Sequence, residues 1–418
     1  MKSPNWVEAS RANRPRVLQV IGNLDVGGAQ EVVRTLAEQW RLAGYESFVA
    51  TLQDGPLRAA IEDAGTPVVV LPDRSHAVLA LPAFALEMRR LRYELLSLIR
   101  QHKIDVVQTH LLRSLDFLVA SLKASAPVQV YWTFHNAHFD LRADHLARHL
   151  WLLGPKRRAH HGLYQLGARH IDGLVAVAPD VKTSILAAMP RIPAGRIAVI
   201  PNGVDTRRYR QTVDRAGVRR MLGLDARARL IAVVATLKEQ KGHRYLIEAA
   251  ARVVGRCPDA HFLLIGDGEL RHALSSQVKA LGLENHVHLL GTRHDVPDLL
   301  AACDLFALPS LWEGLAMALV EAMAAGLPVV ATNVSGTRQV VVDGATGLLV
   351  PPADTEQLVA ALVTLLEDPA RAREMGAAGR ERVESLFSAT KQAADYLSLF
   401  GREITMPSPV TAVGGRMA

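Results

Sequence analysis

Two glutamates and a run of backbone amides stand close together in the segment LPSLWEGLAMALVEAMAAGLPVVAT. We expect Glu313 at the mouth of a helix and Glu321 eight residues later along it, so that both side chains point to roughly one side. Amides that are unpaired at a helix start bind anions with the help of the helix dipole. In this segment they would be those of Gly314, Leu315 and Ala316. A carboxylate beside an anion is favourable only if it accepts hydrogen bonds from hydroxyl groups, which a sugar would supply. The alternative is that Glu313 only caps the helix and that Glu321 is solvated.

Two further patterns follow apolar runs in the first half of the chain. In LDVGGAQ, the residues Gly27 and Gly28 have no Cβ atom, which would let backbone amides approach a phosphate or an acceptor. A tight turn between a strand and a helix would have the same sequence. In WTFHNAH, the imidazole of His135 could donate a hydrogen bond to a sugar hydroxyl or to charge on a leaving group, or it could be purely structural. His110, at the end of IDVVQTH, presents a weaker case of the same kind.

Several common catalytic motifs are absent from the sequence. There is no H-E-x-x-H, no C-x-x-C pair, no P-loop and no G-x-S-x-G, so metalloprotease, zinc-module, Walker ATPase and serine-elbow hydrolase chemistry have no support. LLIGDGELR contains Gly266 in a G-x-G pattern, but Arg271 stands where a dinucleotide fingerprint has its third glycine. We therefore expect no metal and no cofactor.

The elements that must position these residues are short, continuous apolar runs. RVLQVIG, SFVATLQ, IDVVQTH, LIAVVATL and HFLLIGDG are examples, and most are separated by helical segments. Continuous apolarity indicates strands that are covered on both faces, as in a parallel sheet between helices. The alternation restarts after IAVIPNGVD, which predicts an α/β fold of two doubly wound domains facing each other across a cleft.

The predicted organisation has five parts. They are a flexible arm (1–14), a domain for the acceptor (15–200), a domain for the donor (201–385), a helix crossing back to the first domain (386–403) and a flexible tail (404–418).

Composition is that of a well-cored globular protein. The 418 residues are 49% hydrophobic and 21% charged, no apolar run approaches the roughly 18 residues that span a bilayer, and the start of the chain lacks the apolar core of a signal peptide. Two cysteines fit a reducing cytosol. Residues 1–205 hold 24 Lys and Arg against 18 Asp and Glu, and a basic stretch at 142–169 interleaves cations with Leu, Trp and Tyr. That stretch could lie on an anionic membrane surface or could be a solvated helix face; nucleic acid is disfavoured because no known module surrounds it.

The pattern E-G-x(6)-E followed by A-x-A-x-G-x-P-V-V-A-T resembles the signature of retaining GT-B glycosyltransferases of the family-4 type. The resemblance extends along nearly the whole chain and implies two Rossmann-like domains. It implies that Glu313 contacts hydroxyls of the donor sugar and Glu321 the nucleotide ribose, while the amides of Leu315 and Ala316 hold the diphosphate.

Other segments match the family less closely. VATLKEQKGHRYLIEA resembles its G-R-L-x-x-x-K-G, which implies that Lys241 binds the diphosphate and stabilises the departing nucleotide. Thr236 replaces the family's usual arginine, and Lys238 could substitute for that charge only if its side chain turns inward.

Three more positions take their roles from the same resemblance. It implies that the segment of Gly266 lines the nucleotide site, that Arg293 and Asp295 lie near the nucleobase, and that His135 is functional. The acidic run Asp267-Gly268-Glu269 is interpreted as a turn, since such enzymes bind the diphosphate with helix dipoles and cations.

Together these features predict a metal-independent retaining glycosyltransferase of the cytoplasm, with a peripheral position on the inner face of the membrane as a further expectation. Its co-substrate would be a nucleotide-diphosphate sugar, and its acceptor a carbohydrate or lipid-linked molecule of cell-surface polysaccharide or glycolipid synthesis. The alternatives are a nucleotide-sugar epimerase of the same fold and a non-catalytic nucleotide-sugar-binding protein.

Overall fold

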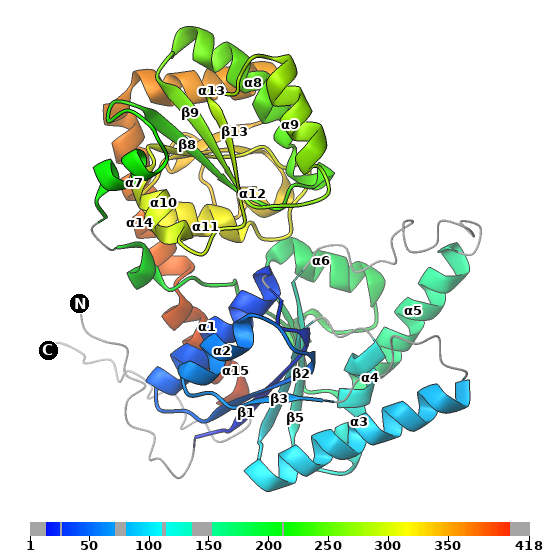
Figure 1. Ribbon diagram of the computed structural model, residues 1–418. Helices are drawn as coiled ribbons and strands as arrows, with labels where there is room; N and C mark the ends of the chain where they lie inside the picture. The colour runs from blue at the N-terminus through cyan, green and yellow to red at the C-terminus, as the bar shows by residue number, and fades with distance from the viewer. Residues whose placement is uncertain are drawn as a thin grey trace, which may run out of the picture.

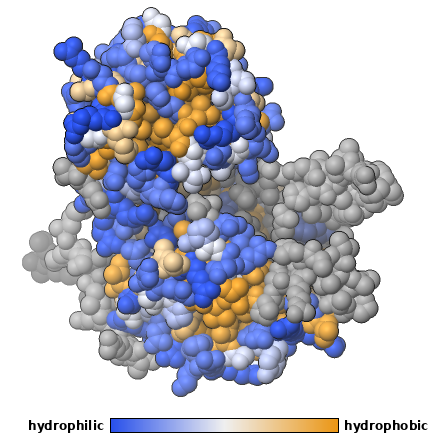
Figure 2. All heavy atoms as spheres, viewed as in Figure 1, coloured by the Kyte–Doolittle hydropathy of each residue, from blue (hydrophilic) through white to orange (hydrophobic). Residues whose placement is uncertain are grey.

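The computed structural model describes residues 14–25, 27–71, 81–110, 114–135, 153–210 and 213–401. Two lobes, each built on a parallel sheet with helices on both faces, lie one above the other (Figure 1). Figure 2 shows the surface hollowed between them. Within the described part of the chain, no helix combines the length and the apolar character that a bilayer-crossing segment needs.

The first lobe contains a parallel sheet in the order β3-β2-β1-β4-β5-β6-β7. Strand order reverses between the neighbours β1 and β4, and the outside of the strands' carboxyl ends at such a point is where doubly wound sheets bind ligands. The strands are β1 (Val17–Asn23), β2 (Ser47–Gln53), β3 (Val68–Val70), β4 (Val106–His110), β5 (Gln129–Phe134), β6 (Gly173–Ala176) and β7 (Ile197–Val199). The helices are α1 (Gly28–Leu42), α2 (Leu57–Asp63), α3 (Leu81–His102), α4 (Ser114–Ala120), α5 (Leu153–Gly167) and α6 (Pro179–Ala188).

The second lobe repeats the arrangement with the order β10-β9-β8-β11-β12-β13 and a reversal between β8 and β11. The strands are β8 (Arg229–Val234), β9 (Ala260–Ile265), β10 (Val287–Gly291), β11 (Leu305–Leu308), β12 (Val329–Thr332) and β13 (Gly347–Val350). The helices are α7 (Arg215–Met221), α8 (His243–Arg256), α9 (Arg271–Ala280), α10 (Val296–Ala302), α11 (Met317–Ala324), α12 (Ser335–Arg338), α13 (Thr355–Glu367) and α14 (Pro369–Leu386). All residues of β11 and β12 are buried, as expected for strands covered on both faces.

The chain crosses between the lobes twice, and the two crossing segments lie side by side. After β7 the chain pairs Val204 with Ser388, which follows α14, and the amide of Ala389 donates to the carbonyl of Val204 at 2.8 Å. The last helix, α15 (Ala389–Gly401), then packs against α1 of the first lobe (Figure 1). Trp40 of α1 is fully buried there, and its Nε1 donates to the carbonyl of Ala393 at 3.2 Å.

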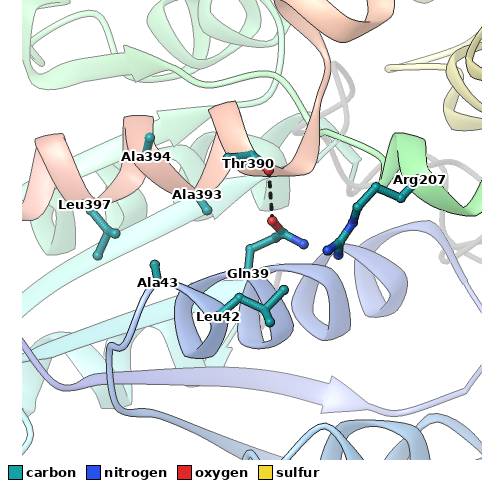
Figure 3. Close-up of a pocket in the computed structure, with 8 residues that line it drawn as sticks. All are labelled: Gln39, Leu42, Ala43, Arg207, Thr390, Ala393, Ala394 and Leu397. Carbon is teal, nitrogen blue, oxygen red and sulfur yellow. Dashed lines mark hydrogen bonds between the residues drawn. The ribbon is translucent and has the colours of Figure 1, made fainter. Parts of the chain in front are cut away.

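Figure 3 shows the contact between these two helices from the side. Thr390 donates a hydrogen bond to Gln39 at 3.0 Å, and Arg207 lies at the end of the shallow pocket that the helices enclose. The contact fixes α15 to the first lobe.

The predicted α/β class with two Rossmann-like doubly wound domains is confirmed. The exact boundaries remain a prediction, and the predicted arm and tail fall outside the described residues, apart from residue 14.

Candidate active site

The loop that follows β8 packs against the loop that follows β11. Residues Glu239–Lys241 form a short 3₁₀ turn, and Gly242 ends it in the left-handed conformation at φ 64°. A Cβ atom on Gly242 would lie 2.0 Å from the carbonyl oxygen of Pro309, so only glycine permits this approach. The amide of Leu311 donates to the carbonyl of Gln240 at 2.7 Å. The sequence K-G thereby brings Lys241 to the loop that carries Glu313.

Glu313 is the centre of a small polar cluster. The ammonium of Lys241 lies 2.6 Å from Oε1 of Glu313, and the hydroxyl of Ser310 donates to the same oxygen at 2.7 Å. The Glu313 side chain is only 6% exposed and that of Lys241 20% exposed. Within the described residues, Oε2 accepts no hydrogen bond, so one oxygen of a charge-balanced carboxylate is available to a ligand.

The segment from Gly314 to Ala316 is a bent loop rather than part of the helix. Helix α11 begins at Met317 with Ala316 as its N-cap, which corrects the prediction that the helix starts after Gly314. The reason is packing: a Cβ on Gly336 would lie 2.4 Å from the carbonyl oxygen of Gly314, so α12 presses on this loop. In the described structure, the amides of Gly314, Leu315 and Ala316 have no acceptor. The predicted run of free donors is therefore present ahead of the helix.

Glu321 lies in the second turn of α11 and faces the first lobe. It is half-buried, which corrects the alternative of a solvated helix residue. Burial, and next the facing carboxylate of Glu31 in α1, raise the pKa of Glu321 from 4.5 to about 7, against the lowering effect of Arg208 and Arg34. Since Glu313 precedes the helix, helical spacing does not relate the two glutamates, and no hydrogen bond joins them in the described structure.

His135 directly follows β5, and its ring is buried against that of His110, the last residue of β4. Nε2 of His135 lies 3.0 Å from Nδ1 of His110, and Nδ1 of His135 lies 3.4 Å from the side-chain nitrogen Nδ2 of Asn202. Burial lowers the pKa of His135 to about 4; burial and then the neighbouring His135 hold the pKa of His110 well below its usual range. Both nitrogens of His135 thus have partners within the described structure, whereas the sequence predicted a donor available to substrate; a direct role of this ring stays a prediction.

The glycines predicted in the first lobe lie at the start of α1. Gly27 is its N-cap, and a Cβ there would lie 2.6 Å from Oε1 of Gln30, whose amide donates to Asn23 at 2.6 Å. A Cβ on Gly28 would meet nothing within 4 Å, so this helix start borders open space.

The remaining predicted residues follow β8, β9 and β10 in the second lobe. Gly266 has φ 138°, and a Cβ there would lie 2.1 Å from the carbonyl oxygen of Ala235, so the loops after β8 and β9 touch. Arg293 forms a bidentate ion pair with Asp295, with N–O distances of 2.8 and 2.5 Å. The side chain of Lys238 is exposed and has no carboxylate partner in the described part of the chain.

The acidic run after β9 is engaged locally. Asp267 accepts hydrogen bonds from the amide of Gly268 at 2.8 Å and from Arg271 at 3.3 Å. Among the described residues, no group of three or more His, Cys, Asp or Glu side chains is arranged to hold a metal ion.

Sequence reasoning missed three residues of these clusters. Ser310 binds Glu313, Asn202 binds His135, and Gln392 of α15 in turn donates to Asn202 at 3.2 Å. Ser310 is only three residues from Glu313, so its proximity could have been noticed. Gln392 gives no local signal, because 190 residues separate it from Asn202.

Two family models match the chain. The one described as "Glycosyl transferases group 1" matches residues 214–382, and "Glycosyltransferase Family 4" matches residues 26–208. Among the curated relatives, the UDP-Gal:alpha-D-GlcNAc-diphosphoundecaprenol alpha-1,3-galactosyltransferase of Escherichia coli is 28% identical over 81% of this chain and 85% of its own length. The alpha-maltose-1-phosphate synthase of Mycolicibacterium smegmatis is 33% identical over 55% of this chain and 62% of its own length.

Solved structures give the same picture for the fold. The complex of Anabaena HepE with UDP-glucose is 25% identical, covers 92% of this chain and 99% of its own, and has a TM-score of 0.75. A glycosyltransferase from Rickettsia africae is 18% identical, covers 94% and 99%, and has a TM-score of 0.79.

Proposed function

This chain belongs to the group 1 glycosyltransferases of the family-4 type, and we propose that it moves a sugar from a nucleotide diphosphate to a hydroxyl acceptor with retention of anomeric configuration. The observation that carries the proposal is the juxtaposition of the Lys241–Glu313 pair with the unpaired amides of Gly314, Leu315 and Ala316. Cation, amides and a buried carboxylate are the groups that a diphosphate and a sugar hydroxyl require.

The donor diphosphate would lie on these amides, with the ammonium of Lys241 beside it. The free Oε2 of Glu313 would accept a hydrogen bond from a hydroxyl of the transferred sugar. As the bond from sugar to phosphate breaks, negative charge grows on the leaving nucleotide, and donors already fixed in place stabilise that charge without further reorganisation. Lys241 and the loop amides can supply this stabilisation without a metal ion.

The rest of the donor site follows from the loops of the second lobe. Glu321 would accept hydrogen bonds from the ribose, and the Arg293–Asp295 pair would border the nucleobase. The close approach at Gly266 would shape the nucleotide pocket, and Lys238 could add a second positive charge if its exposed side chain turned toward the phosphates.

The acceptor would bind in the first lobe, near Gly27, Gly28 and the two buried histidines. No carboxylate of the described residues is assigned here as a covalent nucleophile, and we propose a front-face transfer through an oxocarbenium-like transition state. Acceptors of cell-surface polysaccharide or glycolipid synthesis fit the diphosphoundecaprenol-linked acceptor named for the Escherichia coli relative.

A cytoplasmic enzyme acting on such an acceptor would rest on the inner face of the membrane. Supporting this, α5 exposes Leu163 and Leu166 in a groove that is also lined by Arg169 and by Lys123, which is ion-paired with Asp172. Apolar side chains flanked by cations suit an anionic lipid surface. Most of the basic stretch at 142–169 lies outside the described residues: its chain up to 152, and its side chains up to 159.

The test begins with thermal-shift screening against UDP-, GDP- and ADP-sugars, followed by turnover with the sugar nucleotide that stabilises the protein. A ligand at a hundredfold excess over its dissociation constant adds about 2.7 kcal/mol. Glu313→Gln should lower turnover at least about a hundredfold while the protein stays folded. The matched control is Glu239→Gln, an exposed glutamate in the 3₁₀ turn that carries Lys241.

Three results would overturn the proposal. They are wild-type turnover by Glu313→Gln, binding of donor with no transfer to any acceptor in a panel, and rapid acceptor-independent epimerisation of the donor detected by NMR. The last two would identify the binding protein and the epimerase respectively.

A further inference from the structure

A line of hydrogen bonds runs from the crossing between the lobes to the two buried histidines. The amide of Gly203 lies 3.0 Å from Oε1 of Gln392, and the side-chain nitrogen of Gln392 lies 3.2 Å from Oδ1 of Asn202. The side-chain nitrogen Nδ2 of Asn202 faces Nδ1 of His135 at 3.4 Å, and Nε2 of His135 faces Nδ1 of His110 at 3.0 Å. All five residues are buried. We call this line the relay.

The direction of every bond in the relay is set by its first member. A backbone N–H can only donate, so the atom of Gln392 that faces Gly203 must be the carbonyl oxygen, and its NH₂ group must donate onward. Asn202 therefore accepts through its oxygen and donates through its nitrogen to His135.

The same rule continues through the two rings. Nδ1 of His135 accepts, so the proton of the neutral ring is on Nε2 and is donated to His110. Nδ1 of His110 accepts in turn, and the single proton of this ring is therefore on Nε2. Protonation of either ring would place two N–H groups face to face, so the geometry keeps both rings neutral. The lowered pKa values of both histidines agree with this.

The last donor of the relay has no acceptor. Nε2 of His110 is buried and finds no hydrogen-bond partner among the described residues, whereas buried donors in folded proteins are normally satisfied. His110 ends β4, the strand that lies beside β1 where the order of the first sheet reverses. Ligands of doubly wound sheets bind beyond the strand ends at this point.

We propose that the relay presents the Nε2–H of His110 to an oxygen atom of the acceptor substrate, a step that rests on the proposed function. His110 is then the substrate-binding histidine, and His135, Asn202 and Gln392 are positioning residues that fix its tautomer. A neutral donor of fixed orientation suits a hydroxyl or a phosphate oxygen, and the acceptor panel distinguishes these by including phosphorylated and unphosphorylated sugars.

The polarity of the relay can be reversed by one substitution that leaves both histidines intact. In Asn202→Asp, both carboxylate oxygens accept, so Nδ1 of His135 must carry the proton, its Nε2 becomes an acceptor, and Nδ1 of His110 donates to it. Nε2 of His110 then loses its proton. NMR of ¹⁵N-labelled histidine should show Nε2–H on both rings of the wild type and Nδ1–H on both rings of the variant. An Nδ1–H tautomer of His110 in the wild type would overturn the proposal.

Kinetics test the role of the donor. With the sugar nucleotide from the screen and its acceptor, His110→Phe should lower kcat/KM about ten- to a hundredfold, and Asn202→Asp by a similar factor. His110→Gln, whose amide can replace the donor, should stay within about threefold of the wild type. Affinity for the nucleoside diphosphate of that sugar nucleotide, measured by calorimetry, should not change in any variant, because the nucleotide is assigned to the other lobe.

The outcomes separate this proposal from the one on which it rests. Absence of glycosyl transfer by the wild type would overturn the proposed function, while the histidine tautomers would still test the relay. Transfer by His110→Phe at the wild-type rate would overturn the role of His110 alone. If His110→Phe fails to fold by circular dichroism, Asn202→Asp and His110→Gln decide the question: equal kcat/KM in these two variants would contradict the proposal.

Discussion

Replacing Glu321 by glutamine should make the stability of the protein less dependent on pH. The pKa of this carboxyl rises from 4.5 to about 7 on folding, chiefly through burial and then through Glu31. A raised pKa means that the folded state favours the protonated acid, so this contribution to stability is fully present below pH 4.5 and is lost as the pH rises through about 7. A shift of this size corresponds to roughly 3 kcal/mol, most of it lost between pH 5 and pH 8.

The assay is urea unfolding of the wild type and Glu321→Gln at several pH values from 5 to 8. The free energy of unfolding of the variant, relative to wild type, should rise by roughly 2–3 kcal/mol over this range. Glu31→Gln should remove the repulsion between the two carboxylates and so lower the pKa of Glu321. The stability of this variant should therefore depend less on pH than that of the wild type. Glu374→Gln, an exposed position on α14, is the control. Parallel pH profiles for wild type and Glu321→Gln would refute the reasoning.

Two further predictions concern the loop after β8. Gly242→Ala should cost more stability than Gly282→Ala, measured by urea unfolding, because both glycines have φ near 65° but only at Gly242 would the Cβ collide with the carbonyl of Pro309; equal losses would show that strain alone matters. Lys241→Met should lower kcat about a hundredfold and Lys238→Met less than about tenfold in steady-state assays. Of these two lysines, only Lys241 is ion-paired with Glu313 in the described structure. The reverse order would move the essential cation to Lys238.

Most of the fold could be predicted from local patterns. Continuous apolar runs such as those of β1 and β11 identify buried parallel strands, because both faces of each strand contact helices. The exact start of α11 could not be predicted. It depends on the close packing of Gly336 in α12 against the loop at Gly314, and no local propensity encodes that these two segments lie together.

The candidate site also has one part that could be predicted from sequence and one part that could not. Short sequence patterns predict that the groups around Glu313 come together. Each of these patterns lies in a loop that directly follows a strand, and such loops meet at one edge of the parallel sheet. The hydrogen-bond partners of His135 could not be predicted from sequence, since the number of free nitrogens on a ring depends on residues elsewhere in the chain. For His135 those partners are His110 and Asn202, which are 25 and 67 residues away.

The relay also connects the proposed acceptor side of the cleft with the crossing between the lobes. Gly203 and Gln392 belong to the two chain segments that pair at the crossing. A displacement of α15 that separated Gln392 from Gly203 would remove the group that fixes the direction of all later hydrogen bonds. His110 would then no longer be held as a donor. The arrangement therefore makes the polarity of a substrate-binding group depend on how α15 packs at the crossing, although no residue of the second sheet is hydrogen-bonded to that group in the described structure.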